Sequence, residues 1–423
     1  MKYSIVTFGC RVNQADSLEF EEQLRACGGV AVAPDEADLV LVNTCSVTAT
    51  ADQGTRQTIR RIARDNPAAR IVATGCYATR RSDEVAALPN VIRVVSNDDK
   101  PKTVALLSTD FGLTTAVRFG DGEGSCGAAL EPGVAGRTAF TLRVQTGCDE
   151  ACSYCIIPTT RGRPRSVPLV DVLAQIDRVV AAGYKEIALT GVHLGSYGRD
   201  LAPASTLVDL LRAAGRRVLS GPPVLFRISS LEPMDCSSEV VDLVAQSGVF
   251  APHFHLPLQH ASDRVLTAMK RPYTCGYYAR LVDRIRREIP HASIGCDVIV
   301  GFPGETGDDF EQLASYLESS PLTHLHVFPY SDRPGTAAAR IGGRVPGLEV
   351  RERARRIRAI GSQLSDRFRE RQVGSIRPAL TVDDGATVVT DNYLKLAIPS
   401  GRARNQFVRV RVLSSRQAEV VGD

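Results

Sequence analysis

Residues 146–155 read Thr-Gly-Cys-Asp-Glu-Ala-Cys-Ser-Tyr-Cys, and this stretch decides how the rest of the chain is interpreted. Its cysteines, Cys148, Cys152 and Cys155, have a C-x3-C-x2-C spacing, which is too dense for a chance group of buried cysteines. A zinc site usually takes four ligands, and no neighbouring histidine or cysteine completes this one. A 4Fe–4S cluster normally takes four cysteines. Three cysteines would leave one iron open to a small molecule.

The cysteine loop follows the first of six predicted strands. These strands alternate with helical stretches and are predicted at residues 140–145, 186–190, 225–229, 253–256, 293–300 and 324–328. Alternating strands and helices form a parallel sheet. Six such strands indicate a barrel or a partial barrel.

The first hundred residues carry three further cysteines in a second alternating pattern. Strands are predicted at residues 3–8, 38–42 and 70–73, with helices at 16–27 and 51–65. Cys10, Cys45 and Cys76 each come just after one of these strands. Ligands bind where the carboxyl ends of parallel strands meet, so the three thiols are expected to converge on a metal site. Three unrelated buried cysteines are the alternative, because free cysteine is common in protein cores.

After the barrel, the sequence predicts first a long helix and then a small β-domain. Apolar residues at three- and four-residue spacing predict a helix over residues 346–371, with one buried stripe and a basic polar face. The arginines of that face are Arg351, Arg353, Arg355, Arg356 and Arg358. Residues 372–423 contain short predicted strands between polar turns, which indicates a small all-β barrel.

The domain boundaries follow from these patterns. Residues 103–136 lose periodicity and contain the turn-rich run Gly120-Asp-Gly-Glu-Gly-Ser-Cys-Gly, which is typical of a linker. We therefore predict a cluster domain at 1–102, a linker at 103–136, a barrel at 137–345, a basic helix at 346–371 and a β-domain at 372–423.

Composition and cysteine usage exclude several classes of protein. Of the 423 residues 43% are hydrophobic, and the formal net charge is +4. No apolar run reaches the roughly 18 residues of a membrane span, and the N-terminus is too short and mixed for a signal peptide. We therefore expect a cytoplasmic protein with no membrane partner. Eleven cysteines in a reducing compartment indicate metal binding or catalysis rather than a disulfide framework.

The cysteine loop resembles the signature of the radical S-adenosylmethionine (SAM) superfamily, which has an aromatic residue, here Tyr154, before its last cysteine. The whole chain resembles the radical SAM methylthiotransferases, and two of its segments are most similar to the MtaB type. Those two segments are Arg227-Ile-Ser-Ser-Leu-Glu-Pro and His326-Val-Phe-Pro-Tyr-Ser. Other matching segments are Thr7-Phe-Gly-Cys-Arg-Val-Asn-Gln, Asn43-Thr-Cys-Ser, Thr74-Gly-Cys-Tyr, Leu189-Thr-Gly-Val-His-Leu-Gly-Ser-Tyr-Gly and Asp297-Val-Ile-Val-Gly-Phe-Pro-Gly-Glu.

The resemblance implies an α/β fold with an N-terminal parallel α/β sheet domain, a central partial (β/α)6 radical SAM barrel and a C-terminal TRAM-like all-β barrel. It implies two 4Fe–4S clusters, the first on Cys10, Cys45 and Cys76 and the second, which binds SAM, on Cys148, Cys152 and Cys155. Further SAM contacts are expected at the strand ends, where polar groups and glycines gather. These candidates are Tyr154, Gly191, Ser230, Glu232, Asp297 and Gly301.

The resemblance also implies a reaction and its partners. The MtaB type adds a methylthio group to carbon 2 of threonylcarbamoyladenosine next to the anticodon of tRNA, using two SAM molecules and a sulfur donor. A monomer that takes electrons from a donor such as flavodoxin or ferredoxin is expected. The alternatives are methylthiolation of isopentenyladenosine in tRNA or of a ribosomal-protein aspartate, and a non-catalytic iron–sulfur RNA-binding protein.

Two further groups of side chains are candidates for substrate contacts. Contacts with the anticodon stem-loop are expected from Arg161, Arg163, Tyr393 and Lys395. The arginines could instead hold the SAM carboxylate or lie on a solvated loop. His253, His255 and His260 crowd around one strand, which favours a core or substrate-facing role over a metal site. The family usually has Ser-Gly where His260-Ala261 stands.

Overall fold

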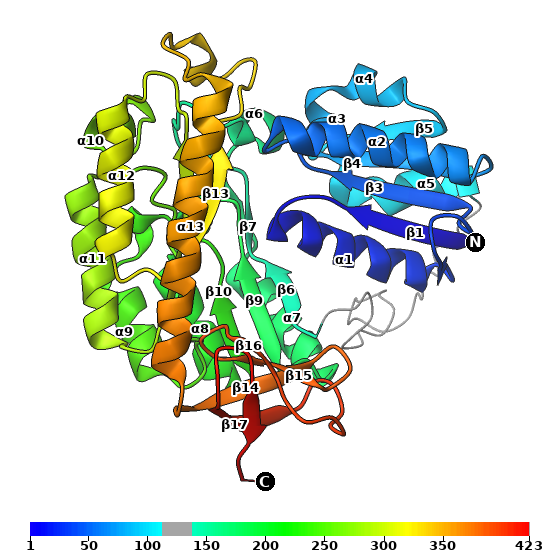
Figure 1. Cartoon of the computed structure of the whole chain (residues 1–423). Helices are drawn as coiled ribbons and strands as arrows, with labels where there is room; N and C mark the ends of the chain where they lie inside the picture. The colour runs from blue at the N-terminus through cyan, green and yellow to red at the C-terminus, as the bar shows by residue number, and fades with distance from the viewer. Residues whose placement is uncertain (112–137, 423) are drawn as a thin grey trace.

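The computed structural model describes residues 1–111 and 138–422, which form a sheet domain, a partial barrel and a small β-domain (Figure 1). The expected α/β fold class is confirmed. In the described part of the chain no helix is both long enough and apolar enough to cross a membrane.

The N-terminal domain is a five-stranded parallel sheet in the order β2-β1-β3-β4-β5. All six residues of β3 are buried, because the sheet is covered on both faces. The strands are β1 (Lys2–Thr7), β2 (Val30–Ala31), β3 (Leu39–Thr44), β4 (Arg70–Gly75) and β5 (Val91–Val95). The helices are α1 (Arg11–Ala26), α2 (Ala49–Asp65), α3 (Cys76–Arg80), α4 (Ser82–Ala86) and α5 (Thr103–Phe111), with a short 3-10 turn at Lys100–Lys102.

Two sequence-based boundaries in this domain were wrong. Helix α1 begins at Arg11, not at residue 16, because Val12 and Ala15 already pack in the core. The interval predicted as a linker from residue 103 begins instead with α5, whose Val104 and Leu107 join the sheet domain's core. The glycine-rich run at residues 120–127 lies outside the described residues.

The central domain contains the six predicted strands. They form two three-stranded parallel sheets, β6-β9-β10 and β11-β12-β13, joined by a bridge between Phe226 and Phe250. The strands are β6 (Phe140–Arg143), β9 (Glu186–Thr190), β10 (Leu225–Ile228), β11 (His253–His255), β12 (Ser293–Val300) and β13 (His324–Pro329). The outer helices are α7 (Leu169–Ala181), α8 (Leu207–Val218), α9 (Ser238–Gln246), α10 (Asp263–Ala268), α11 (Cys275–Glu288) and α12 (Gly307–Ser319).

Side chains alternate in polarity across these barrel strands. Residues such as Ile187, Phe226 and Cys296 face the helices and build the largest hydrophobic core. Their neighbours on each strand point to the other, inner face because the side-chain period of a strand is two. The inner residues include Glu186, Arg227, His253, His255, Asp297, His324 and His326. The inner face is therefore polar, unlike the packed interior of a closed barrel.

The C-terminal part begins with α13 (Gly347–Gln372), which packs along β13 and α12 (Figure 1). This helix coincides with the one expected at residues 346–371, and its stripe from Ala354 to Phe368 is buried as expected. An antiparallel sheet follows in the order β16-β15-β14-β17-β18. Its strands are β14 (Ile376–Val382), β15 (Thr387–Thr390), β16 (Lys395–Ala397), β17 (Phe407–Val412) and β18 (Ala418–Val420).

Candidate functional site: two cysteine triads at a domain interface

The first cysteine triad lies where three neighbouring strands end. Cys10 precedes the first turn of α1, Cys45 directly follows β3, and Cys76 directly follows β4 and begins α3. Because β1, β3 and β4 are adjacent in the sheet, their carboxyl ends bring the thiols to one edge, as predicted. Cys45 and Cys76 are buried and Cys10 is exposed, so the triad opens to its surroundings on the Cys10 side.

Two glycines allow the backbone of this edge to close around the triad. Gly9 has φ +88°, and a Cβ added to it would lie 2.5 Å from the Cys45 Sγ atom. Gly75 has φ +100°, and a Cβ there would lie 2.2 Å from the Thr44 carbonyl oxygen. Only glycine takes these backbone angles without strain and also leaves room for the neighbour. The sequences Gly9-Cys10 and Gly75-Cys76 are thus part of the site.

The thiols of this triad have contrasting environments. Burial raises the pKa of Cys45 to about 11. Burial would also raise the pKa of Cys76, but the positive charges of Arg161 and Lys100 outweigh it and lower that pKa. A cysteine binds metal as the thiolate, and Arg161 and Lys100 favour the thiolate form of Cys76. The Val47 N–H points at the Cys45 Sγ at 3.5 Å.

The second triad lies on the single loop between β7 (Gln145–Thr146) and α6 (Ile157–Arg161). Backbone N–H groups of Glu150 and Ile157 donate to the sulfurs of Cys148 and Cys155, each at 3.4 Å. The Arg271 Nη1 atom donates to the Cys152 Sγ at 3.0 Å. Burial raises the pKa of Cys155 to about 12, so without a bound cation this thiol stays protonated at neutral pH.

Both triads fit an iron–sulfur cluster better than a single metal ion. Among the described residues, neither triad brings its three sulfurs within 4.8 Å of one another, as the ligands of one ion would be. Each triad offers three thiols with N–H groups directed at sulfur, which is how proteins hold and tune such clusters. A three-thiol set leaves one iron of a 4Fe–4S cluster without a protein ligand.

Arg161 joins the two triads. It ends α6, six residues after Cys155, and packs beside α3, which begins at Cys76. Its Nη2 atom donates to Asn13 Oδ1 at 2.5 Å and to Asp16 Oδ2 at 3.3 Å. Its guanidinium is 2% exposed and has no surface to offer a phosphate. The RNA contact predicted for Arg161 was therefore wrong; the residue ties the barrel to the sheet domain.

Asp16 is the acceptor at the centre of this interface. Lys100 Nζ lies 2.6 Å and Arg143 Nη1 lies 2.9 Å from its carboxylate oxygens. Burial would raise the pKa of Asp16, but Lys100, Arg161 and Arg143 together lower it to about 2. The carboxylate is ionised at neutral pH and balances cations from both domains. Neither its burial nor its partners could be found from local sequence pattern.

Four of the predicted SAM contacts follow barrel strands: Gly191 after β9, Ser230 and Glu232 after β10, and Gly301 after β12. Asp297 lies within β12 and Tyr154 lies on the cysteine loop, not at a strand end. Gly191 follows β9, and the two N–H groups after it donate to Gln145 Oε1 at 2.9 Å. Gly301 follows β12, and its N–H donates to Glu305 Oε2 at 2.7 Å. A Cβ at Gly301 would lie 2.5 Å from Val350 on α13. These contacts within the protein explain why both positions hold glycine. Contacts between either glycine and SAM remain predictions.

Three of the polar candidates, Ser230, Glu232 and Asp297, are held by hydrogen bonds or an ion pair. Glu232 forms an ion pair with Arg271, the residue that also donates to Cys152. Asp297 accepts from His255, and the hydroxyl of Ser230 bonds the other nitrogen of that ring. Tyr154 packs beside Phe302 and Tyr330, and burial raises its pKa well above the ordinary value. Arg271 was missed by sequence reasoning because it lies outside every matching segment.

The remaining RNA candidates lie at the surface. Arg163 is exposed, and Lys395 is exposed beside Asp383 at 2.9 Å. Tyr393 is 45% exposed, and its ring packs on His253 and under the Arg227 guanidinium. Their contacts with RNA remain predictions. His260 is fully buried and accepts from the Ser262 N–H, which is a core role.

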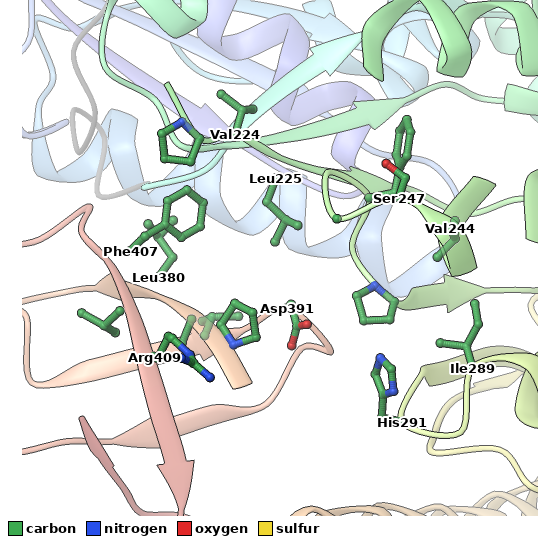
Figure 2. Close-up of a pocket in the computed structure, with 18 of the residues that line it drawn as sticks. Val224, Leu225, Val244, Ser247, Ile289, His291, Leu380, Asp391, Phe407 and Arg409 are labelled. Atoms are coloured by element: carbon green, nitrogen blue, oxygen red, sulfur yellow. The ribbon is translucent and has the colours of Figure 1, made fainter. Parts of the chain in front are cut away.

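A large cavity lies away from both triads. It measures about 790 Å³ and separates the barrel from the C-terminal sheet. Figure 2 shows Leu225, Val244 and Ile289 of the barrel facing Leu380 and Phe407 of that sheet. Leu225 is the first residue of its strand, so the cavity is at the amino ends of the strands, opposite the cysteines. It is not part of the candidate site.

Comparisons with known proteins agree with this geometry. Residues 2–96 match the uncharacterized protein family UPF0004, and residues 142–317 match the radical SAM superfamily. The fold is similar to the radical SAM methyltransferase TsrM of Kitasatospora setae, with a TM-score of 0.56 and 18% identity over 80% of this chain and 76% of that one. That likeness concerns the fold alone.

Curated relatives cover nearly the whole chain. The threonylcarbamoyladenosine tRNA methylthiotransferase MtaB of Aquifex aeolicus is 34% identical over 97% of this chain and 100% of its own length. The Bacillus subtilis protein of the same name is 33% identical over 97% of this chain and 93% of its own length. A tRNA-2-methylthio-N(6)-dimethylallyladenosine synthase of Corynebacterium efficiens is 32% identical, with 95% and 78% covered. The chain belongs to the radical SAM methylthiotransferases of the MtaB type.

Proposed function

We propose that this enzyme adds a methylthio group to carbon 2 of threonylcarbamoyladenosine next to the anticodon of tRNA. One observation carries the proposal: two cysteine triads lie on facing domains and are joined by the buried Arg161, in a chain similar over its whole length to proteins named for this reaction. A radical SAM domain implies one 4Fe–4S cluster and SAM. The second cluster, on Cys10, Cys45 and Cys76, is part of the proposal.

The two triads have different tasks in this proposal. Clusters and SAM bound there supply the radical that removes the hydrogen from carbon 2 and the sulfur that replaces it. Cys148, Cys152 and Cys155 hold the cluster that binds SAM, and Arg271 stabilises the Cys152 thiolate through its hydrogen bond. Arg161 fixes α3 against α6, so that the sulfur source and the radical source keep one relative position.

We assign SAM binding to Tyr154, Gly191, Ser230, Glu232, Asp297 and Gly301. RNA binding is assigned to Arg163, Lys395 and Tyr393, together with the exposed arginines of α13. Those arginines are fewer than the sequence suggested. Arg353 is buried against Glu305, and the exposed Arg356 pairs with Glu311. Arg351, Arg355 and Arg358 are exposed and are not in these ion pairs. Phosphate contacts of this kind give salt-dependent affinity.

The partners proposed for the reaction are tRNA, a sulfur donor and an electron donor such as flavodoxin or ferredoxin. The test uses the reconstituted enzyme with SAM, reductant and sulfide on two anticodon stem-loops. One stem-loop carries threonylcarbamoyladenosine and the other carries dimethylallyladenosine. We expect a methylthio product, detected by nucleoside mass spectrometry, from the first RNA only. Product from the second RNA alone, or SAM cleavage without any RNA product, would contradict the proposal.

A further inference from the structure

The inner face of the barrel carries a patch of histidines that the proposed roles leave without a task. His253 and His255 alternate with Phe254 on β11, while His324 and His326 alternate with Leu325 on β13. β12 lies between these strands and contributes Asp297, which the proposed function already assigns to SAM binding, so the patch lies beside the proposed SAM site. Because alternate residues of a strand share a face, all four imidazoles and the carboxylate lie together. We call these five residues the histidine patch.

The contacts within the patch are close. Ring centroids of His255 and His326 are 5.1 Å apart, and those of His324 and His326 are 5.7 Å apart. Asp297 Oδ1 lies 2.9 Å from His255 Nε2 and 3.1 Å from His326 Nδ1. These hydrogen bonds lower the pKa of Asp297, although burial acts in the opposite direction. Asp297 is therefore an anion that orients both rings.

The other two domains complete the patch. Tyr393 of the C-terminal domain packs on His253 with ring centroids 4.7 Å apart. Arg11, the first residue of α1, donates from Nη2 to the Tyr393 hydroxyl at 3.2 Å. Figure 1 shows the first turn of α1 directed at the barrel. Arg11 also directly follows Cys10, so Arg11 and Tyr393 connect the histidine patch to the exposed cysteine of the first triad.

Several side-chain nitrogen atoms here lack an acidic partner. Within the described residues, Arg11 forms no ion pair, and its side chain donates a hydrogen bond only to the Tyr393 hydroxyl. The His326 side chain is 54% exposed, and its Nε2 atom points away from the bond with Asp297. His253 is 4% exposed and its Nδ1 atom has no partner. A buried polar atom without a partner is rare and indicates a missing ligand or water.

We propose that Arg11 and the histidine patch bind the carboxylate of the threonylcarbamoyl group and thereby select this nucleoside over one with an apolar substituent. The proposal deepens the proposed function and rests on it. A cationic arginine and imidazole N–H groups are suitable partners for a carboxylate and its neighbouring hydroxyl. They are a poor environment for a dimethylallyl group, whose burial would leave these polar groups without partners.

A divalent metal is the other ligand that two histidines and one aspartate can hold. The hydrogen bonds favour the carboxylate. His255 Nε2 and His326 Nδ1 both lie at hydrogen-bond distance from the same carboxylate oxygen, Asp297 Oδ1. Each nitrogen therefore donates a hydrogen bond to this oxygen, and neither offers a free lone pair to a metal. The charge that remains uncompensated is the positive charge of Arg11, which a metal cation would repel.

The test compares two stem-loops that differ only in the threonyl carboxylate, one with the free acid and one with its methyl ester. Wild-type enzyme, Arg11→Met, Arg11→Lys and His326→Phe are assayed for product formation on both RNAs. Arg216→Met, an exposed arginine on α8, is the matched control. Wild type and control should favour the acid in kcat/KM by about 10- to 100-fold, the range expected for hydrogen bonds to a charged group.

Arg11→Met and His326→Phe should reduce this preference to within about threefold, mainly by losing activity on the acid, and Arg11→Lys should recover part of it. Iron content and SAM cleavage without RNA are measured for every variant, because Arg11 adjoins Cys10. An unchanged acid-to-ester ratio in variants with full iron would overturn the inference, as would extra tightly bound metal lost in Asp297→Asn. Wild type without product on either RNA would instead overturn the proposed function.

Discussion

The three cysteines of each triad are brought together in different ways. Cys148, Cys152 and Cys155 lie on one loop, and their spacing alone indicates a shared centre. Cys10, Cys45 and Cys76 are far apart in the chain and meet only because β1, β3 and β4 end side by side. The loop triad can form wherever its loop can wrap around a cluster. The sheet triad depends on the packing of the whole N-terminal domain.

The largest expected effect separates the chemistry of the two triads. Cys152→Ala should reduce the release of 5′-deoxyadenosine from SAM to background and abolish the RNA product. Cys76→Ala should abolish the RNA product but leave SAM cleavage at the same order of magnitude as in wild type. Chromatography of SAM products and nucleoside mass spectrometry measure the two activities. Loss of SAM cleavage in both variants would show that the triads do not act separately.

The next effect concerns the packing that the sheet triad requires. Gly9→Ala places a Cβ at 2.5 Å from Cys45 Sγ at φ +88°, so we expect iron content to fall to about half. Gly28→Ala is the matched control, because Gly28 has φ +75° with no atom within 4 Å of its added Cβ. It should lose some stability from backbone strain but retain full iron. Equal iron losses would mean that strain, not contact with Cys45, limits cluster binding.

The interface between the triads should matter for stability. Arg161→Met removes a buried cation from Asp16 and should lower the free energy of unfolding by about 3 kcal/mol. Urea unfolding of the reduced, cluster-free protein measures this change. Arg165→Met, which breaks an exposed pair with Asp98, should cost less than about 1 kcal/mol. Similar costs for the two variants would contradict a structural role for Arg161.

A smaller effect should appear as a pH dependence. The folded-state pKa of Asp16 is lowered to about 2 from 3.8, so the stability it contributes is complete above pH 3.8 and is lost as pH falls toward 2. The stability difference between wild type and Asp16→Asn should therefore shrink by about 2 kcal/mol between pH 5 and pH 2. Urea unfolding of the cluster-free proteins at several pH values measures it. A difference that stays constant would exclude the Asp16 ion pairs as its source.

The two triads also show which features of the structure could be predicted from the sequence and which could not. The six barrel strands and the three strand-end cysteines were predicted, because periodicity and turn residues are local signals. The burial of Arg161 was not, because its partners Asn13 and Asp16 come from another domain. The pairing of Arg353 and Arg356 with glutamates on neighbouring elements was missed for the same reason. The alternation His253-Phe-His255 was a usable signal for a polar inner face.

The most direct test of the account is an iron count by Mössbauer spectroscopy with and without each triad. We predict about eight irons per chain in the reconstituted wild type, as two 4Fe–4S clusters. Replacing either Cys10, Cys45 and Cys76 or Cys148, Cys152 and Cys155 by alanine should leave about four. About four irons in wild type, unchanged when the sheet triad is replaced, would contradict the two-cluster account.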